Sequence, residues 1–205
     1  WGSRDGELVV CHDPDISRTS NGTGTVEALD WSTIASFDAG SWFAPEWTGV
    51  PVCRFQDILR EFAGRIEMNI HVKAPGADGW VIRKIRDLVA DFGVTKHIYL
   101  AGHRDVLAWA RELAPDIARC CLDELQNLTI VQHAIAYDCQ RVQFFDPYYT
   151  EALIQEAHSH GMICNFFFAD TAQHATELYH QGIDAVLTNF ANRVLPVVRA
   201  ERATQ

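Results

Sequence analysis

The sequence predicts an α/β fold, a (β/α)8 barrel from which the first strands are missing in the chain as given. Apolar runs of strand length alternate with stretches of helical periodicity, a pattern typical of a parallel sheet. Six such runs are fewer than the eight strands of a closed barrel, and 205 residues are fewer than the usual length of about 250. An open doubly wound sheet with six strands is the structural alternative.

The apolar runs and two clear helical stretches define the elements in order. The expected strands cover residues 65–73, 97–102, 117–122, 141–147, 162–168 and 185–189. Between the first two, residues 79–93 carry apolar side chains at helical spacing and end at Gly93. Residues 170–182 predict a second helix that a cap-like Asp170 opens and Gly182 closes. We expect one domain over residues 1–205.

The first residues predict a tight turn followed by a strand. Arg4, Asp5 and Gly6 have turn chemistry, and a tight turn needs an earlier strand to turn from. The apolar run 8–11 then leads into a histidine, His12, at the expected tip of a strand.

Composition and charge exclude several classes of protein. The formal net charge is -10, so no basic face is expected to attract nucleic acid or an anionic membrane. No apolar run has the length of a membrane span. The six cysteines form no Cys-x-x-Cys pair and several lie in apolar runs, which favours reduced, buried thiols over a disulfide or a thiolate metal site. We expect a cytoplasmic protein; nothing in the sequence indicates its oligomeric state.

Side-chain alternation along residues 65–73 predicts a polar face that ends in two candidate functional residues. The apolar set faces the covering helices, so Glu67, Asn69, His71 and Lys73 face the barrel interior. His71 and Lys73 lie at the carboxyl end of the strand, where barrel active sites are built. A buried lysine needs a negative partner, either an internal carboxylate or a bound anion. The alternative interpretation of this pair is purely structural: Lys73 pairs with a carboxylate, and His71 donates a hydrogen bond to a carbonyl oxygen.

Two stretches of the sequence match the motifs of a known family: residues 5–43, which begin DGELVVCHDPDISRTSNGTG and end DAGSWF, and the later MNIHVK. In these stretches the chain resembles the glycerophosphodiester phosphodiesterase family. That family has a DG turn, a strand ending in His-Asp, an R-T-T-N-G-x-G loop, a D-A-G-x-W-F segment and then N-I-E-x-K. The later stretch, FFFADTAQHATELYHQGIDAVLTN, resembles the family's last two strands. The His-Asp and RTSNGTG portion is the specific part of the resemblance.

The resemblance implies roles for four residues. His12 matches one of two histidines that act as general acid and base, and Lys73 would bind the phosphate. Phe167 would contact the substrate, and His71 occupies the position of a metal-binding glutamate. In the RTSNGTG loop, Asn21, Gly22 and Gly24 are expected to supply turn conformations.

Two departures from the family pattern leave two functions open. The H-R-G and Glu-x-Asp elements are absent from the sequence as given, and His71 replaces the glutamate of N-I-E-x-K. The implied cofactor is a divalent ion, calcium or magnesium by resemblance and manganese or zinc given His71. The leading function is metal-dependent hydrolysis of a small-molecule glycerophosphodiester to glycerol phosphate and an alcohol, in lipid and glycerol metabolism. The alternative is a weak or inactive barrel homologue that binds a phosphorylated ligand. Trp42, Phe43 and Phe145 are expected in the core, with a pocket for an apolar substituent as the alternative.

Overall fold

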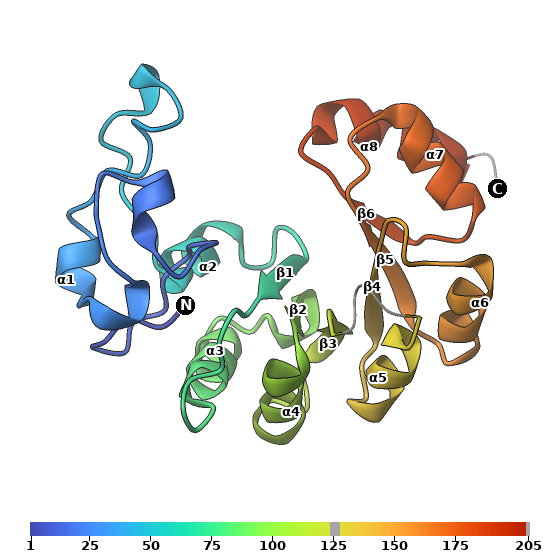
Figure 1. Cartoon of the computed structure of the whole chain (residues 1–205), viewed down its shortest axis with the longest axis horizontal. Coiled ribbons are helices and arrows are strands. Elements are labelled where there is room, and N and C mark those ends of the chain that lie inside the picture. The colour runs from blue at the N-terminus through green and yellow to red at the C-terminus, as the bar shows by residue number, and fades with distance from the viewer. Residues whose placement is uncertain (124–127, 204–205) are drawn as a thin grey trace. The chain divides into compact units, whose positions relative to one another are not determined.

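A computed structural model describes residues 1–123 and 128–203 of the chain. The chain divides into two compact units (Figure 1). The first comprises Trp1–Tyr99 and Glu112–Ile117, and the second comprises Leu100–Arg111 and Ala118–Gln205. The prediction of one domain is not tested by this division and stays a prediction.

Short helices and irregular segments dominate the first unit. Its elements are η1 (Ile16–Thr19), η2 (Val26–Ala28), α1 (Trp31–Ile34), η3 (Pro45–Trp47), α2 (Phe55–Phe62), β1 (Met68–His71), α3 (Trp80–Asp91) and η4 (Thr95–His97). Val9, Ile16, Val26, Ile34 and Val52 form a buried cluster under the N-terminal loops. This cluster gives the loops a core of their own, which holds them in place where regular hydrogen-bond ladders are few.

Strands and helices alternate regularly through the second unit, which the chain enters within β2. The elements are β2 (Ile98–Gly102), α4 (Arg104–Leu113), β3 (Ala118–Cys121), α5 (Ile130–Ala136), β4 (Arg141–Phe145), α6 (Glu151–Ser159), β5 (Ile163–Phe167), α7 (Ala172–His180), β6 (Ala185–Leu187) and α8 (Ala191–Ala203). Strands β3 to β6 pair in parallel, with Cys120 opposite Arg141, Arg141 opposite Ile163 and Asn165 opposite Ala185. Parallel neighbours require a crossover connection, and a helix supplies each one.

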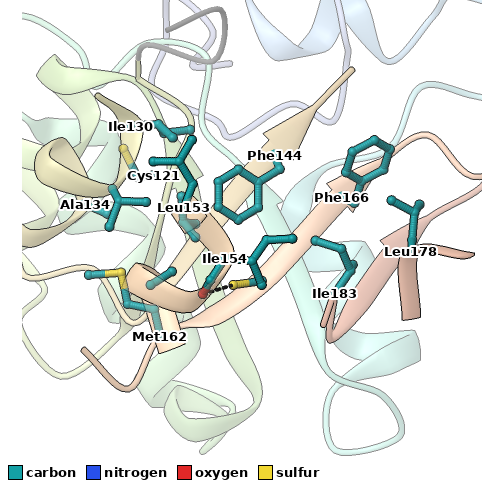
Figure 2. Close-up of a cluster of buried hydrophobic side chains, with 14 of the residues drawn as sticks. Cys121, Ile130, Ala134, Phe144, Leu153, Ile154, Met162, Phe166, Leu178 and Ile183 are labelled. Atoms are coloured by element: carbon teal, nitrogen blue, oxygen red, sulfur yellow. Dashed lines mark hydrogen bonds between the residues drawn. The ribbon is translucent and has the colours of Figure 1, made fainter. Parts of the chain in front are cut away.

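A large apolar cluster fills the space between these strands and helices (Figure 2). Phe144 of β4 and Phe166 of β5 are its largest fully buried side chains. Residues on both faces of β2, β3 and β4 are buried, as is typical of a parallel sheet covered by helices. Fully burying one such side chain contributes about 1.5–3 kcal/mol of transfer free energy.

The strand order decides between the two fold classes that the sequence left open. The sheet order β1-β2-β3-β4-β5-β6 is the order in sequence. A doubly wound sheet reverses its strand order at a switch point, whereas a barrel winds in one direction. The prediction of a barrel-type α/β fold is confirmed, and all six expected strands are present with shorter bounds. No helix in the described part of the chain is long and apolar enough to cross a membrane.

The predicted turn at residues 4–6 is present, but the predicted strand after it is not. Gly6 adopts φ +86° and its amide donates to the Ser3 carbonyl at 3.0 Å. Leu8 and Val9 then make only isolated antiparallel bridges, to Gly2 and Arg54. His12 therefore lies in a bend rather than at a strand tip. The apolar run was misleading because Leu8 and Val9 are buried in packing rather than in a ladder.

One further local prediction was wrong in detail. Thr171 rather than Asp170 caps α7, because its hydroxyl accepts from the His174 amide at 3.2 Å. The Asp170 carboxylate instead accepts from the main chain and side chain of Asn189.

The RTSNGTG loop uses its turn residues in different ways. Gly24 has the expected positive φ of +105°. Gly22 is needed for close approach, since a Cβ there would lie 2.3 Å from the Phe37 ring. Asn21 serves through its side chain, whose Oδ1 accepts from the Asp38 amide at 2.8 Å.

Candidate active site

A cavity of about 570 Å³ in the first unit contains three of the predicted site residues. His12, His71 and Lys73 line it, and most of the remaining lining is apolar, including Ile70 and Val81. An apolar cavity with a few convergent polar groups is the usual form of a small-molecule site. Along β1, Met68 is buried while Asn69 and His71 are exposed, in line with side-chain alternation; the orientation of the polar set toward a barrel interior stays a prediction.

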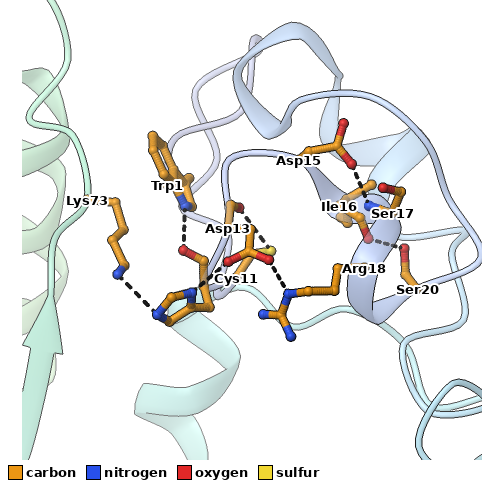
Figure 3. A network of polar contacts seen from close by, with 10 residues as sticks. Trp1, Cys11, Asp13, Asp15, Ile16, Ser17, Arg18, Ser20 and Lys73 are labelled. Carbon is orange, nitrogen blue, oxygen red and sulfur yellow. Dashed lines mark hydrogen bonds and ion pairs between the residues drawn. The ribbon is translucent and has the colours of Figure 1, made fainter.

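His12 is hydrogen-bonded through both ring nitrogens. Its Nδ1 lies 2.7 Å from Oδ1 of Asp13, and its Nε2 lies 3.3 Å from Nζ of Lys73. Figure 3 shows this network from Lys73 to Asp13 and on to Arg18. The indole of Trp1 also donates to the His12 carbonyl at 3.3 Å, which fixes the main chain. The predicted proximity of His12 and Lys73 is confirmed.

The two partners of His12 determine where its proton lies. An ionised Asp13 can only accept, so Nδ1 carries the hydrogen. Nε2 then has a free lone pair and accepts from the Lys73 ammonium. A side chain oriented by a carboxylate in this way presents a basic nitrogen toward the cavity.

The Arg18 guanidinium helps to keep Asp13 ionised. The Arg18 guanidinium and then the His12 ring donate to its carboxylate, and together they hold the Asp13 pKa at about 2. Arg18 lies in η1, which begins at the cap residue Asp15, whose Oδ1 accepts from the Ser17 amide at 2.8 Å. The RTSNGTG loop was expected to serve backbone geometry, and a role for Arg18 was not predicted. Its spacing of five residues from Asp13 was the available signal.

Lys73 is the candidate anion-binding group. Burial lowers its pKa, because desolvation disfavours the ammonium, and the Asp13 charge acts in the opposite direction. In the described part of the chain no carboxylate lies within ion-pair distance of Lys73. Among the described residues the partner of Lys73 is His12, so an internal carboxylate partner stays an alternative that these residues do not supply.

His71 was predicted as a metal ligand, and it lines the same cavity as Lys73. No three histidine, cysteine, aspartate or glutamate side chains that include His71 gather within 4.8 Å over residues 1–123 and 128–203. The described residues therefore do not by themselves fit a metal ion at this place. The role of His71 stays a prediction.

Phe167, the predicted substrate contact, lies in the second unit at the carboxyl end of β5. Its ring centroid is 5.0 Å from that of Phe145 at the end of β4 and 5.0 Å from that of Phe168. Phe145 and Phe167 are half-buried, whereas Phe168 is 52% exposed. Aromatic side chains thus gather at the edge of the parallel strands where ligands of such folds bind.

Trp42 and Phe43 were expected in the core, and this was wrong. They are 51% and 71% exposed, and neither lines the cavity. The segment that carries them is ordered instead by Asp38, whose carboxylate accepts from the amides of Gly40, Ser41 and Gly49. An aspartate that satisfies three amides allows a loop to keep its shape without burying its aromatic rings.

A barrel-type α/β fold with an oriented histidine beside a lysine is suited to an enzyme site that combines acid–base chemistry with anion binding. The model of the glycerophosphoryl diester phosphodiesterase family matches residues 2–193. The chain belongs to this family, whose members are phosphoric diester hydrolases.

One curated protein and two solved structures illustrate the similarity, and the solved structures share the fold of this chain. A glycerophosphodiester phosphodiesterase of Bacillus subtilis is 24% identical over 92% of this chain and 71% of its own length. The glycerophosphodiester phosphodiesterase of Agrobacterium tumefaciens has a solved structure with a TM-score of 0.78, 23% identity and coverage of 92% of this chain and 80% of its own. A phosphodiesterase of Oleispira antarctica, solved with the product sn-glycerol-3-phosphate, gives a TM-score of 0.82, 19% identity and coverage of 97% and 82%.

Proposed function

We propose that this protein hydrolyses glycerophosphodiesters to glycerol phosphate and an alcohol. The observation that carries the proposal is the position of His12, held between a carboxylate and an ammonium group in one cavity. Membership of the family and the product bound by the Oleispira antarctica relative support the choice of substrate.

The chemistry requires proton transfer at one nitrogen and charge neutralisation beside it. Nε2 of His12 takes or returns a proton during the attack on phosphorus or the departure of the alkoxide. Asp13 holds the ring and stabilises the imidazolium that forms. The Lys73 ammonium leaves its contact with Nε2 and donates to a non-bridging phosphate oxygen, where negative charge must be neutralised.

We propose His71 as one ligand of a divalent ion, with manganese or zinc favoured over calcium or magnesium by its imidazole nitrogen. Such an ion would supply further neutralisation of the phosphate charge. The residues described do not assemble the rest of such a site, so the roles of His12, Asp13 and Lys73 are derived without it.

The aromatic residues at the ends of β4 and β5 suit the organic part of the substrate. We propose that Phe167 contacts the glycerol or the leaving alcohol through its ring face. The replacement of the family's glutamate by His71 is the observation that favours the second candidate function, a weak or inactive homologue that binds a phosphorylated ligand.

Release of glycerol 3-phosphate from glycerophosphocholine by the full-length protein tests the proposal. Native protein should turn over the substrate, and His12→Ala should abolish turnover while leaving the circular dichroism spectrum unchanged. His97→Ala, at an exposed histidine just before the amino end of β2, is the matched control and should keep native activity. Undiminished activity of His12→Ala would refute the assignment. Binding of glycerol 3-phosphate without turnover of any diester would establish the second candidate.

A further inference from the structure

Three potential metal ligands of different chemistry meet in the second unit, at the amino ends of β5 and β6. His158 lies near the end of α6, Cys164 is the second residue of β5, and Asp184 immediately precedes β6. One ligand atom from each of them lies within 4.8 Å of the others. Because barrel active sites form at the carboxyl ends of strands, this cluster lies at the other edge of the sheet.

Hydrogen bonds already hold the three residues in a fixed arrangement. Oδ2 of Asp184 accepts from the Cys164 amide at 2.7 Å and lies 3.0 Å from Nε2 of His158. The Asp184 amide in turn donates to the Cys164 carbonyl at 2.9 Å. Two of the three candidate ligands are therefore tied to each other through main-chain atoms, and the third is hydrogen-bonded to them.

The spacing is close to that of a tetrahedral zinc site. With Zn–N and Zn–O distances of about 2.0–2.2 Å and Zn–S of about 2.3 Å, tetrahedral ligand atoms lie roughly 3.3–3.6 Å apart. The His158 to Asp184 separation of 3.0 Å is slightly short of this range, and no separation in the cluster exceeds 4.8 Å. Side-chain adjustments on the order of 1 Å bring all three atoms to bonding distance.

Burial gives the cluster a closed side and an open side. Cys164 is fully buried, while the His158 and Asp184 side chains are 39% and 43% exposed. An ion can reach the cluster from solvent past His158 and Asp184. A water molecule would take the fourth position, as in other zinc sites with three protein ligands.

We propose that His158, Cys164 and Asp184 bind zinc or a similar borderline transition metal. One thiolate, one imidazole and one carboxylate suit zinc or cobalt and disfavour calcium and magnesium, which take oxygen ligands. When the metal–sulfur bond forms, Cys164 gives up its hydrogen bond to the Ile154 carbonyl and its proton passes to solvent. The hydrogen on Nε2 of His158, which faces Asp184, moves to Nδ1, so that the Nε2 lone pair can bind the metal in place of that hydrogen bond. The bound ion links α6 to the starts of β5 and β6 and stabilises the folded state. The absence of Cys-x-x-Cys pairs in the sequence argued against a thiolate site, but this cluster uses a single cysteine.

Titration of the full-length, metal-free protein with cobalt(II) tests the proposal, because a thiolate ligand produces a sulfur-to-cobalt charge-transfer band in the near ultraviolet. The native protein should show this band at one equivalent of cobalt, and zinc should displace the cobalt. His158→Ala should weaken cobalt binding by more than about tenfold, since even loss of an outer partner of a ligand costs 10- to 100-fold. Cys164→Ser should remove the band.

Two controls separate this site from others. His160→Ala, two residues beyond His158 and also exposed, should leave the affinity unchanged. His71→Ala should keep the band, which separates this cluster from any metal bound in the cavity. Absence of the band in native protein, or its persistence in a folded Cys164→Ser variant, would overturn the proposal.

Discussion

The pairing of His12 with Asp13 gives the sharpest test of the catalytic geometry. In Asp13→Asn the side chain keeps its size but loses its charge, so it no longer stabilises the imidazolium that forms when Nε2 takes a proton. The Lys73 ammonium, 3.3 Å from Nε2, still donates to that nitrogen, so the neutral ring keeps its hydrogen on Nδ1 and the asparagine oxygen accepts from it. The variant therefore removes the charge that stabilises the protonated ring and leaves the neutral ring in place.

The size of the effect follows from the exposure of the ring. General acid–base catalysis contributes about 10²- to 10⁴-fold, and a histidine that loses the carboxylate partner of its imidazolium form loses part of it. The His12 side chain is 73% exposed, so it can rotate and recover part of its function. We expect kcat to fall by roughly 10- to 100-fold, at the low end of the range for a lost acid–base group, with a smaller change in KM.

Steady-state kinetics with glycerophosphocholine across pH 5–9 measure this loss. Asp116→Asn, at an exposed aspartate of the first unit, is the matched control and should behave as native. If Asp13→Asn kept native kcat and pH dependence, the argument that Asp13 stabilises the protonated His12 ring would be refuted.

Three further predictions follow from the same contacts. Lys73→Met should raise KM and lower kcat for a phosphodiester, because its ammonium is the group available to the anion; an unchanged phosphate affinity by calorimetry would contradict this. His71→Glu should shift metal preference toward magnesium or calcium, and native metal affinity should fall as pH drops through about 6.5, where histidine protonates; equal metal titrations of native protein and His71→Ala would show that His71 is no ligand. Asp38→Ala should lower the free energy of unfolding at neutral pH, because three amides lose their acceptor. The Asp38 pKa is held at about 2 by its hydrogen bonds from the amides of Ser41, Gly49 and Gly40, below its unfolded value of 3.8. Its contribution is therefore full above pH 4 and lost as pH falls toward 2, so denaturant titrations should show native and variant converging there.

Local pattern determined the alternating architecture and part of the site. The strands and helices of the second unit follow from apolar runs and helical spacing, which arise within a few residues of the chain. The placement of Lys73 on the side of His71, two residues beyond the end of β1, followed from side-chain alternation, because a strand places every second residue on the same face. The resemblance of the His-Asp and RTSNGTG stretch to a known family supplied the role of His12, which no local periodicity could give.

Contacts between distant residues decided the rest. Lys73 could meet a carboxylate or His12, and only the fold, which brings positions 61 residues apart to 3.3 Å, selects His12. The exposure of Trp42 and Phe43 depends on a loop held by hydrogen bonds from three main-chain amides to the Asp38 carboxylate. Amino-acid composition does not predict such a loop geometry. The cluster of His158, Cys164 and Asp184 arises because a parallel sheet places the starts of successive strands side by side. Burial and hydrogen bonding at such sites depend on which segments become neighbours, and tertiary structure alone determines that.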